Sequence, residues 1–528
     1  MSGAPFRTRW AALIAATGGV LGALAFPQVG WWPLAFVSVA ALSVAVHGRR
    51  ARTGAWLGYL YGAAFFVPLL HWTGVYVGAF PWLLLAAAEA GFMAALGAAL
   101  TALQRLRAPA FWVASAWVLQ EALRDRLPFG GFPWGRLAFS QADSPFRWFA
   151  RLGGMPLLSF AVALTAAAVW QLGEVARGDG GLRRRAIGPF AAALAVTMFA
   201  VVLAGTARAE PSSHDKRLSI AVIQGSVPDR GLAFEDRARE VLDNHIAQTD
   251  KLAADIAAGR VERPDLVLWP ENASDVDPFQ DPVAFQDIDN AVKRIGVPVL
   301  VGAILQGPGD KRRNAGILWS PTTGPGAQYI KRHPVPFGEY IPLRSVAKVF
   351  SSDVNLVSQD MVGGHGNGLL RGGPVPIGDV ICFEVAYDSL VQSSVRAGAQ
   401  LVVVQTNNAT FGHTSETYQQ LAMTKLRAIE TGRTVIQAAT TGKSAIVEPD
   451  GKVVAESGAL FTPSVLVSSI PLETDRTLAV RLGAVPEYVL AAIALAGILY
   501  AALPWMRSRR WHRPGRPATD DVEEMVRT

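Results

Sequence analysis

The stretch GDVICFEVAYD, from Gly378 to Asp388, runs from a short apolar segment directly into the only cysteine of the 528-residue chain. A short apolar run that ends in polar residues is typical of a buried strand in an α/β sheet. The chemistry of such sheets lies just beyond the strand ends. Taken alone, a cysteine in an apolar run is a small core residue. Cys382 is therefore either core filling or a reactive thiol, and the surrounding sequence bears on the choice.

The same pattern continues on both sides of this stretch. Short β-branched runs followed by turn residues occur in RLSIAVIQGSV, PDLVLWPEN, VPVLVGAIL and LVVVQTNNATFG, and helical patterns such as SETYQQLAMTKLRAIETGR lie between them. Alternating strands and helices favour an α/β domain with largely buried strands. We predict this domain over residues 217–472.

Outside this domain the composition is that of a membrane protein. The chain is 51% hydrophobic and 17% charged, with a mean hydropathy of +0.26, which is too apolar for an ordinary soluble enzyme. Runs long enough to cross a bilayer are predicted at about 10–26, 31–47, 54–72, 80–104, 109–124, 155–173, 187–206 and 483–505. We therefore predict a transmembrane domain over residues 1–208 with seven helices, an eighth helix at 483–505 and a basic, polar tail at 506–528.

Arginine clusters between the spans predict the orientation. With a cytoplasmic N terminus, the clusters at 49–52, 105–107 and 183–185 all fall on the inner side, as the positive-inside rule requires. The α/β domain then lies on the outer, periplasmic side of the cell membrane, and both termini are cytoplasmic. The net charge of +7 resides in such short clusters, so no nucleic-acid partner is predicted.

Two features of the predicted membrane half allow more than one interpretation. Glu121 lies in the weakest span, and we place it near the outer end, where interfacial solvation lowers the cost of a charge. The loop from Leu127 to Gly154 mixes glycine, proline, aromatic residues and arginine. It is interpreted either as an interfacial aromatic belt or as a re-entrant platform that contacts lipid head groups.

Three polar positions stand at predicted strand ends or on a nearby loop. Glu271 follows DLVLW, Lys331 and Glu339 lie in YIKRHPVPFGEYIP, and Cys382 follows GDVI. The thiolate is the nucleophilic form, so a working cysteine needs a base and a nearby positive charge. Glu and Lys supply both. A free thiol on an oxidising side of the membrane, where idle cysteines tend to be lost or paired, favours the functional interpretation.

Histidine offers a rival partner for the cysteine. His333 and His413 lie closest to the candidate loops, so a Cys/His dyad is the alternative. Neither follows a strand as Glu271 does. No pair of residues shows metal-ligand spacing such as HExxH, and we predict no metal and no cofactor.

In order and strand context, Glu271, Lys331 and Cys382 resemble the Glu, Lys and Cys triad of the nitrilase superfamily. The segment KLRAIETGRTVIQAATTGKSAIVEPDGKVV, from Lys425 to Val454, also resembles that superfamily. With the spans, the loop FPWGRLAFSQAD and the motif VPFGEYIP, the sequence resembles its membrane-embedded branch, the apolipoprotein N-acyltransferase family. The resemblance implies an α/β fold, a nitrilase-like αββα sandwich inserted between the transmembrane helices of an eight-span membrane domain.

The resemblance also implies a two-step acyl transfer. The sn-1 acyl chain of a phospholipid moves to Cys382 as a thioester, and then to the α-amino group of the diacylglyceryl-modified N-terminal cysteine of a bacterial apolipoprotein. Glu271 would be the base, and Lys331 would bind the oxyanion together with the backbone N–H of Phe383. Glu339 and Glu384 resemble supporting acids of the family, with structural ion pairs as the alternative. The implied partners are the phospholipid donor, the diacylated apolipoprotein and membrane lipids, and the chain is expected to act as a monomer.

Two departures from the family pattern leave rivals open. The family's Asn-Asp-Ala-Trp-Phe-Gly reads NNATFG here, on a loop where Asn408, Thr410 and Phe411 are expected at the substrate entrance. A common Cys-Tyr-Glu reads Cys-Phe-Glu. One rival function is a membrane-tethered nitrilase-like amidase or hydrolase, which would use water as acceptor. The other is a non-catalytic membrane scaffold.

Overall fold

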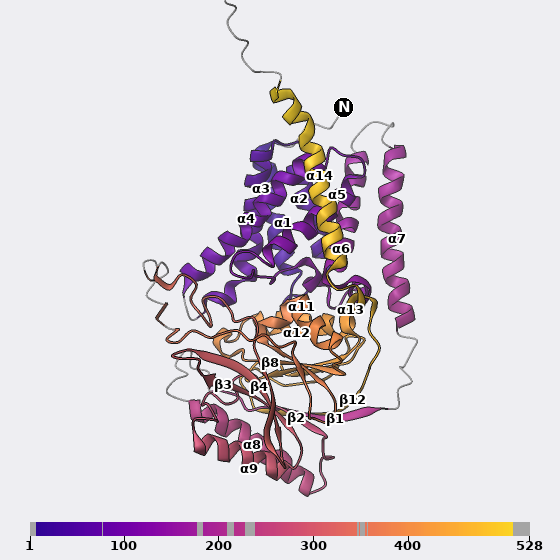
Figure 1. Ribbon diagram of the computed structural model, residues 1–528. Coiled ribbons are helices and arrows are strands. Elements are labelled where there is room, and N and C mark those ends of the chain that lie inside the picture. Colours follow the sequence, from indigo (N-terminus) through magenta and orange to yellow (C-terminus); the bar gives the residue numbers. More distant parts are fainter. Residues whose placement is uncertain are drawn as a thin grey trace, which may run out of the picture.

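The computed structural model describes residues 7–75, 78–176, 183–207, 216–227, 238–345, 348, 354–355 and 357–510. The predicted tail over 506–528 lies outside the described residues from residue 511 onward. Long helices form one end of the molecule and a sandwich of two sheets forms the other (Figure 1).

The helices of the membrane half pack as a bundle that the C-terminal helix joins from the far end of the sequence. They are α1 (Thr8–Leu24), α2 (Leu34–Val46), α3 (Ala51–Leu69), α4 (Ala79–Leu103), α5 (Pro109–Arg124), α6 (Phe149–Ala176), α7 (Arg183–Ala207) and α14 (Val485–Arg510). Glycines let α3 and α4 approach closely, since a Cβ on Gly58 would lie only 2.2 Å from the carbonyl oxygen of Met93. Small residues at such contacts are typical of helices that associate in a membrane.

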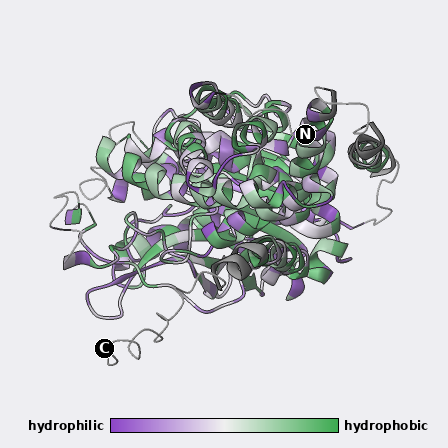
Figure 2. Cartoon of the chain, turned by 90° about the horizontal axis from the view of Figure 1, so that it is seen from above, coloured by the Kyte–Doolittle hydropathy of each residue, from purple (hydrophilic) through white to green (hydrophobic). Residues whose placement is uncertain are grey.

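Hydrophobic residues occupy outward as well as inward faces of this bundle, as the view from above shows (Figure 2). Among the described helices, three are long and apolar enough to cross a membrane, at Ala79–Leu103, Pro145–Glu174 and Val485–Leu503. Shorter apolar helices occupy Thr8–Leu24, Leu34–Val46 and Leu194–Leu203. A helical membrane half is thus present, and the count of eight spans stays a prediction.

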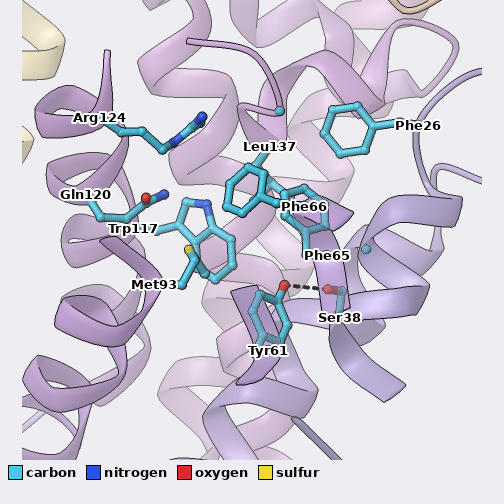
Figure 3. A pocket seen from close by; sticks show the side chains of 12 residues that line it. Phe26, Ser38, Tyr61, Phe65, Phe66, Met93, Trp117, Gln120, Arg124 and Leu137 are labelled. Carbon is cyan, nitrogen blue, oxygen red and sulfur yellow. Dashed lines mark hydrogen bonds between the residues drawn. The ribbon is translucent and has the colours of Figure 1, made fainter. Parts of the chain in front are cut away.

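Two pairs of polar side chains contact each other inside the bundle. Arg124 forms a buried ion pair with Glu89 at 3.0 Å, and Ser38 and Tyr61 share a hydrogen bond of 2.5 Å. Arg124, Ser38 and Tyr61 line a small cavity between the helices (Figure 3). Polar groups in a bilayer need such partners because no water is present to solvate them.

The sandwich consists of two six-stranded sheets. The first has the order β12-β1-β2-β3-β4-β5 and the second β11-β10-β9-β8-β7-β6. The first sheet contains β1 (Arg217–Gln224), β2 (Leu266–Leu268), β3 (Val299–Gln306), β4 (Arg312–Ser320), β5 (Gly324–Ile330) and β12 (Ser464–Pro471). The second contains β6 (Leu369–Leu370), β7 (Ile377–Ile381), β8 (Leu401–Thr406), β9 (Thr434–Ala439), β10 (Ala445–Val447) and β11 (Val453–Glu456). The strands β1, β2 and β3 pair in parallel, as do β7, β8 and β9.

Helices cover both outer faces of the paired sheets. The outer face of the first sheet packs against α8 (Ala238–Ala257) and α9 (Pro282–Ile295). The inner faces of the two sheets share one apolar core. On the second sheet lie α11 (Asp388–Arg396) and α12 (Glu416–Thr431), whose apolar residues join the core of the membrane bundle. The predicted α/β fold with two sheets is confirmed, and its α11/α12 layer faces the bundle (Figure 1).

The loop between α5 and α6 is buried over much of its length. Its residues from Trp134 to Ala142 are buried, and they form a layer between the bundle and the α11/α12 side of the sandwich. Glu121 is 1% exposed and accepts hydrogen bonds from the Leu137 N–H at 2.7 Å and the Trp117 indole at 3.1 Å. The expected placement of Glu121 in an interfacial, solvated position was therefore wrong, because this loop covers it.

Candidate active site

Cys382 lies where β7 ends and a short 3₁₀ helix, η6 (Cys382–Ala386), begins. Its φ angle is +54°, in the left-handed region that non-glycine residues seldom occupy and that concentrates at functional sites. Thr406 at the end of β8 donates a hydrogen bond to its Sγ at 3.4 Å, and Gln420 on α12 does so at 3.8 Å. Strand end, neighbouring strand and helix thus converge on the sulfur.

A buried cation lies beside this sulfur. Lys331, at the end of β5, is 2% exposed, and its Nζ lies 3.1 Å from Glu271 Oε1 and 2.9 Å from Glu339. Burial opposes the charge of the ammonium group, but Glu271, Glu339 and Cys382 outweigh it and raise the pKa of Lys331 well above its ordinary value. The ammonium group therefore stays charged. The structure brings Glu271, Lys331, Glu339 and Cys382 together.

Both oxygens of the Glu271 carboxylate are held in place. Asn314 Nδ2 donates to Glu271 Oε1 at 2.6 Å and to Glu339 Oε1 at 3.2 Å. The backbone N–H of Asn407 donates to Glu271 Oε2 at 2.8 Å. These donors fix the orientation of the carboxylate while leaving it an acceptor of protons.

Burial and the nearby negative charge of Glu271 raise the pKa of the Cys382 thiol, while Lys331 and the hydrogen bond from Thr406 lower it. The raising effects dominate, so the resting sulfur is a neutral thiol. A group that removes the proton during the reaction is therefore needed, and Glu271, whose charge acts on the thiol, is the candidate.

Glu384 joins the two loops that carry the lysine and the cysteine. Its carboxylate accepts hydrogen bonds from the backbone N–H groups of Arg332 at 2.7 Å and Ile381 at 2.9 Å, and from the Tyr329 hydroxyl at 2.9 Å. Burial raises the pKa of Glu384, and these donors act in the opposite direction. The residue therefore holds the backbone on both sides of the site.

Phe383 contacts the membrane half through its side chain. The ring stacks on Trp134 with the ring centres 5.7 Å apart and on Phe132 at 5.4 Å, and both partners belong to the loop between α5 and α6. The oxyanion role assigned to its backbone N–H remains a prediction.

The three residues expected at a substrate entrance lie in different environments. Asn408 is 2% exposed, and its Nδ2 donates to Glu416 at 2.7 Å and to Gln420 at 2.9 Å, so it forms part of the wall behind the cysteine. Thr410 and Phe411 are half-buried. The Phe411 ring meets Trp72 of the membrane half edge-on at 4.9 Å.

The rival histidines lie elsewhere. The His333 ring packs on Tyr387 at 4.2 Å, and burial together with Lys331 lowers its pKa. The His413 ring packs on Phe461 at 4.7 Å. Among the described residues, the hydrogen bonds to the cysteine sulfur come from Thr406 and Gln420, which favours the Glu/Lys interpretation over a Cys/His dyad.

Several residues of the site were missed in the sequence. These are Asn314, Tyr329, Thr406, Glu416 and Gln420. Asn314 and Tyr329 carried at most a weak signal, because each lies inside a strand but next to another polar residue, Arg313 and Gln328 respectively. Burial raises the pKa of Glu416 to about 8, so this carboxyl group is largely protonated at neutral pH.

A buried charge network ties the site to the bundle. Arg427 on α12 donates to the carbonyl oxygens of Val385 at 2.7 Å and Ala386 at 2.9 Å, and so holds the loop that follows the cysteine. Its guanidinium lies 2.8 Å from Asp388, which Arg136 of the α5–α6 loop approaches at 3.0 Å. One carboxylate thus bridges arginines from the two halves of the molecule.

Comparison with known proteins gives consistent results over both halves. Residues 18–168 match the family model described as the apolipoprotein N-acyltransferase N-terminal domain, and residues 220–479 match the carbon-nitrogen hydrolase model. The apolipoprotein N-acyltransferase of Mycolicibacterium smegmatis is 39% identical over 519 residues, which cover 94% of this chain and 86% of that protein. This chain belongs to the apolipoprotein N-acyltransferase family.

More distant apolipoprotein N-acyltransferases match this chain over most of its length. The protein from Haemophilus influenzae is 26% identical, with coverage of 94% of this chain and 95% of that one. Among solved structures, an amidase from Nesterenkonia sp. AN1 is 21% identical, covers 50% of this chain and 92% of its own, and has a TM-score of 0.36. The resemblance to the apolipoprotein N-acyltransferase family is confirmed, and with it the assignment as an acyltransferase.

Proposed function

We propose that this chain transfers the sn-1 acyl chain of a phospholipid, through a thioester on Cys382, to the α-amino group of a diacylglyceryl-modified N-terminal cysteine of bacterial apolipoproteins. The observation that carries the proposal is the buried Lys331 ammonium between Glu271 and Glu339, beside a cysteine with a left-handed backbone. Family membership supplies the substrate class.

In the first step Glu271 takes the thiol proton as the sulfur attacks the ester carbonyl carbon. The developing oxyanion binds Lys331 Nζ and the Phe383 N–H, and each such donor in a dry site contributes roughly 3 kcal/mol. Collapse of this tetrahedral intermediate breaks the ester bond. The departing sn-1 oxygen receives the proton from Glu271. The lysophospholipid then departs, and the acyl chain remains on Cys382 as a thioester.

In the second step the free amine of the apolipoprotein attacks the thioester carbonyl. Glu271 accepts a proton from the attacking nitrogen and returns it to the departing sulfur, so that the amide forms and the thiol is restored. The same two donors stabilise the second oxyanion. Asn314, Glu339 and Glu384 hold the base, the lysine and the two loops in position.

The membrane half supports this choice of substrates. Both substrates are lipid-anchored, so the site must lie close to acyl chains, and the contacts of Phe383 and Phe411 with Trp134 and Trp72 lie on that side of the sandwich. We infer that eight helices cross the membrane, with residues 1–208 and 483–505 as the membrane domain and 217–472 as a catalytic domain on the periplasmic side. The site needs no metal or cofactor for this reaction, and the chain acts as a monomer.

Mass spectrometry of the Cys382 peptide tests the proposal. The full chain is incubated with a phospholipid labelled in its sn-1 chain, and the Cys382→Ala variant serves as the control. We expect a labelled adduct that neutral hydroxylamine removes and that a diacylated lipopeptide discharges with transfer of the label. Release of free fatty acid with no transfer would indicate a hydrolase instead. A folded sample without any adduct would contradict the acyl-enzyme route.

A further inference from the structure

A second buried carboxyl group lies close to the triad, and the mechanism above does not use it. Asp379 is the third residue before Cys382 on β7 and is 1% exposed. Among the described residues, no donor makes a hydrogen bond of ordinary geometry to either of its carboxyl oxygens. A buried carboxylate without a partner is strongly unfavourable, so this group requires a physical explanation.

A second acceptor oxygen lies close to this carboxyl group. A Cβ on Gly316, in β4 of the facing sheet, would lie 1.9 Å from Asp379 Oδ2 and 2.6 Å from Gln405 Oε1. Both oxygens therefore lie side by side against the Gly316 backbone. Gln405 Oε1 likewise has no donor among the described residues, while its Nε2 donates to the Trp269 carbonyl at 2.7 Å. Two such oxygens repel each other unless one carries a proton.

The charges around Asp379 favour its protonated form. Glu384 and Glu271 both act on it, and both are acidic. Burial, assisted by these two groups, raises the pKa of Asp379 well above its ordinary value, and the Val380 N–H opposes this only in part. A carboxylic acid kept neutral in this way serves as a hydrogen-bond donor.

We propose that Asp379 is a positioning residue that remains protonated and donates its O–H to Gln405 Oε1. The hydrogen bond orients Gln405, whose Nε2 holds the carbonyl of Trp269, two residues before Glu271. The connection Asp379–Gln405–Trp269 therefore joins the strand that leads to the cysteine to the loop that carries the base, across the two sheets. The inference deepens the proposed function, since it rests on Glu271 acting as that base.

Infrared spectroscopy of the full chain in lipid nanodiscs tests the protonation state without any turnover. At neutral pH the difference between the native protein and the Asp379→Asn variant is expected to show the carbonyl band of one protonated carboxylic acid. The bands of an ionised carboxylate in that difference would overturn the proposal. Because no substrate is present, a failure of the proposed acyl transfer cannot produce this result.

Rates of Cys382 acylation by labelled phospholipid test the positioning role. Asp379→Leu removes the donor and Gln405→Met removes the acceptor, and each should lower kcat roughly tenfold, as loss of one buried hydrogen bond does, with KM unchanged. Asp379→Asn keeps a donor and should stay within about twofold of the native rate by the same reasoning. Equal rates for the Leu and Asn variants would contradict the proposal. If Asp379→Leu does not fold, the comparison of Asp379→Asn with Gln405→Met decides.

Discussion

At the scale of single residues, the cysteine is controlled by the charges beside it. Burial and Glu271 raise the pKa of Cys382, and Lys331 lowers it. In the proposed mechanism the thiol therefore stays neutral until Glu271 takes its proton. A neutral thiol also resists oxidation, because oxidation follows thiolate character.

This balance predicts opposite effects for two substitutions. Glu271→Gln removes a negative charge, so the pKa of Cys382 should fall and alkylation by iodoacetamide at neutral pH should become faster, while acylation by phospholipid is lost with the base. Lys331→Met should raise the pKa of the thiol and slow alkylation. Because the chain has one cysteine, thiolate absorbance against pH reports this group alone. Glu262→Gln, at an exposed position, is the control, and a rise in the thiol pKa of Glu271→Gln would contradict the prediction.

Glu416 predicts a pH dependence of stability. Its pKa is about 8 in the folded chain against an ordinary value of 4.5, so between these values the folded state holds a proton that the unfolded state lacks. Stability should then fall as pH rises from about 4.5 to 8, by at most about 1.4 kcal/mol per pH unit. Glu416→Gln removes this pH-dependent contribution to the free energy of unfolding. Thermal unfolding midpoints at pH 5 to 8 should therefore fall less steeply in the variant, and parallel slopes would argue against a raised pKa.

At the scale of elements, the site depends on how closely two strands from different sheets approach. Gly316 in β4 faces Asp379 in β7, and no side chain fits between them, since a Cβ there would lie 1.9 Å from Oδ2. The absence of a side chain on β4 is therefore what allows the two sheets to meet under the triad.

Gly316→Ala should accordingly destabilise the sandwich by about 1–3 kcal/mol, the usual cost of overpacking a core. Gly458→Ala is the matched control, because an added Cβ there meets nothing within 4 Å. The difference between the unfolding midpoints of the two variants checks the prediction. Equal midpoints would mean that the sheets can separate at little cost.

At the scale of the whole molecule, the two halves share buried charges as well as apolar contacts. Asp388 forms ion pairs with Arg427 of α12 and with Arg136 of the α5–α6 loop. Arg136 also lies 3.3 Å from Asp125 at the end of α5. Arg427 in turn holds the carbonyl groups that follow the cysteine. The bundle therefore contributes to the position of the nucleophile through one carboxylate.

A double-mutant cycle of Arg136→Met and Asp388→Asn measures this connection. Removing Arg136 leaves the Asp125 carboxylate without this partner and leaves Asp388 paired with Arg427 alone, which should cost about 3 kcal/mol. The two substitutions together should cost less than the sum by about 1–3 kcal/mol. The exposed pair Arg260 and Asp255 provides the control cycle, with a coupling below about 1 kcal/mol. Additive costs at Arg136 and Asp388 would show that the halves are energetically independent there.

Much of this organisation was accessible from the sequence, for physical reasons. Glu271 and Cys382 were predicted at strand ends because apolar, β-branched runs indicate buried strands. The alternation of strands and helices predicted an α/β domain, and the family resemblance implied its two sheets. Asn314 and Gln420 were missed, because their side chains reach the site only through strand pairing within the first sheet and the packing of α12 on the second. The burial of Glu121 was missed too, since hydropathy along the chain does not reveal that a distant loop covers a helix end.

The stacking of Phe383 on Trp134 has a practical consequence for protein production. A fragment that contains the sandwich alone would lose the Trp134 indole. It would also lose Arg136, which pairs with Asp388, and the apolar residues that cover α12, so a wide hydrophobic surface would be exposed to solvent. Such fragments should precipitate or require detergent even though they contain no spanning helix. Crystallisation, screening and inhibitor discovery on this enzyme therefore call for the intact, lipid-embedded chain.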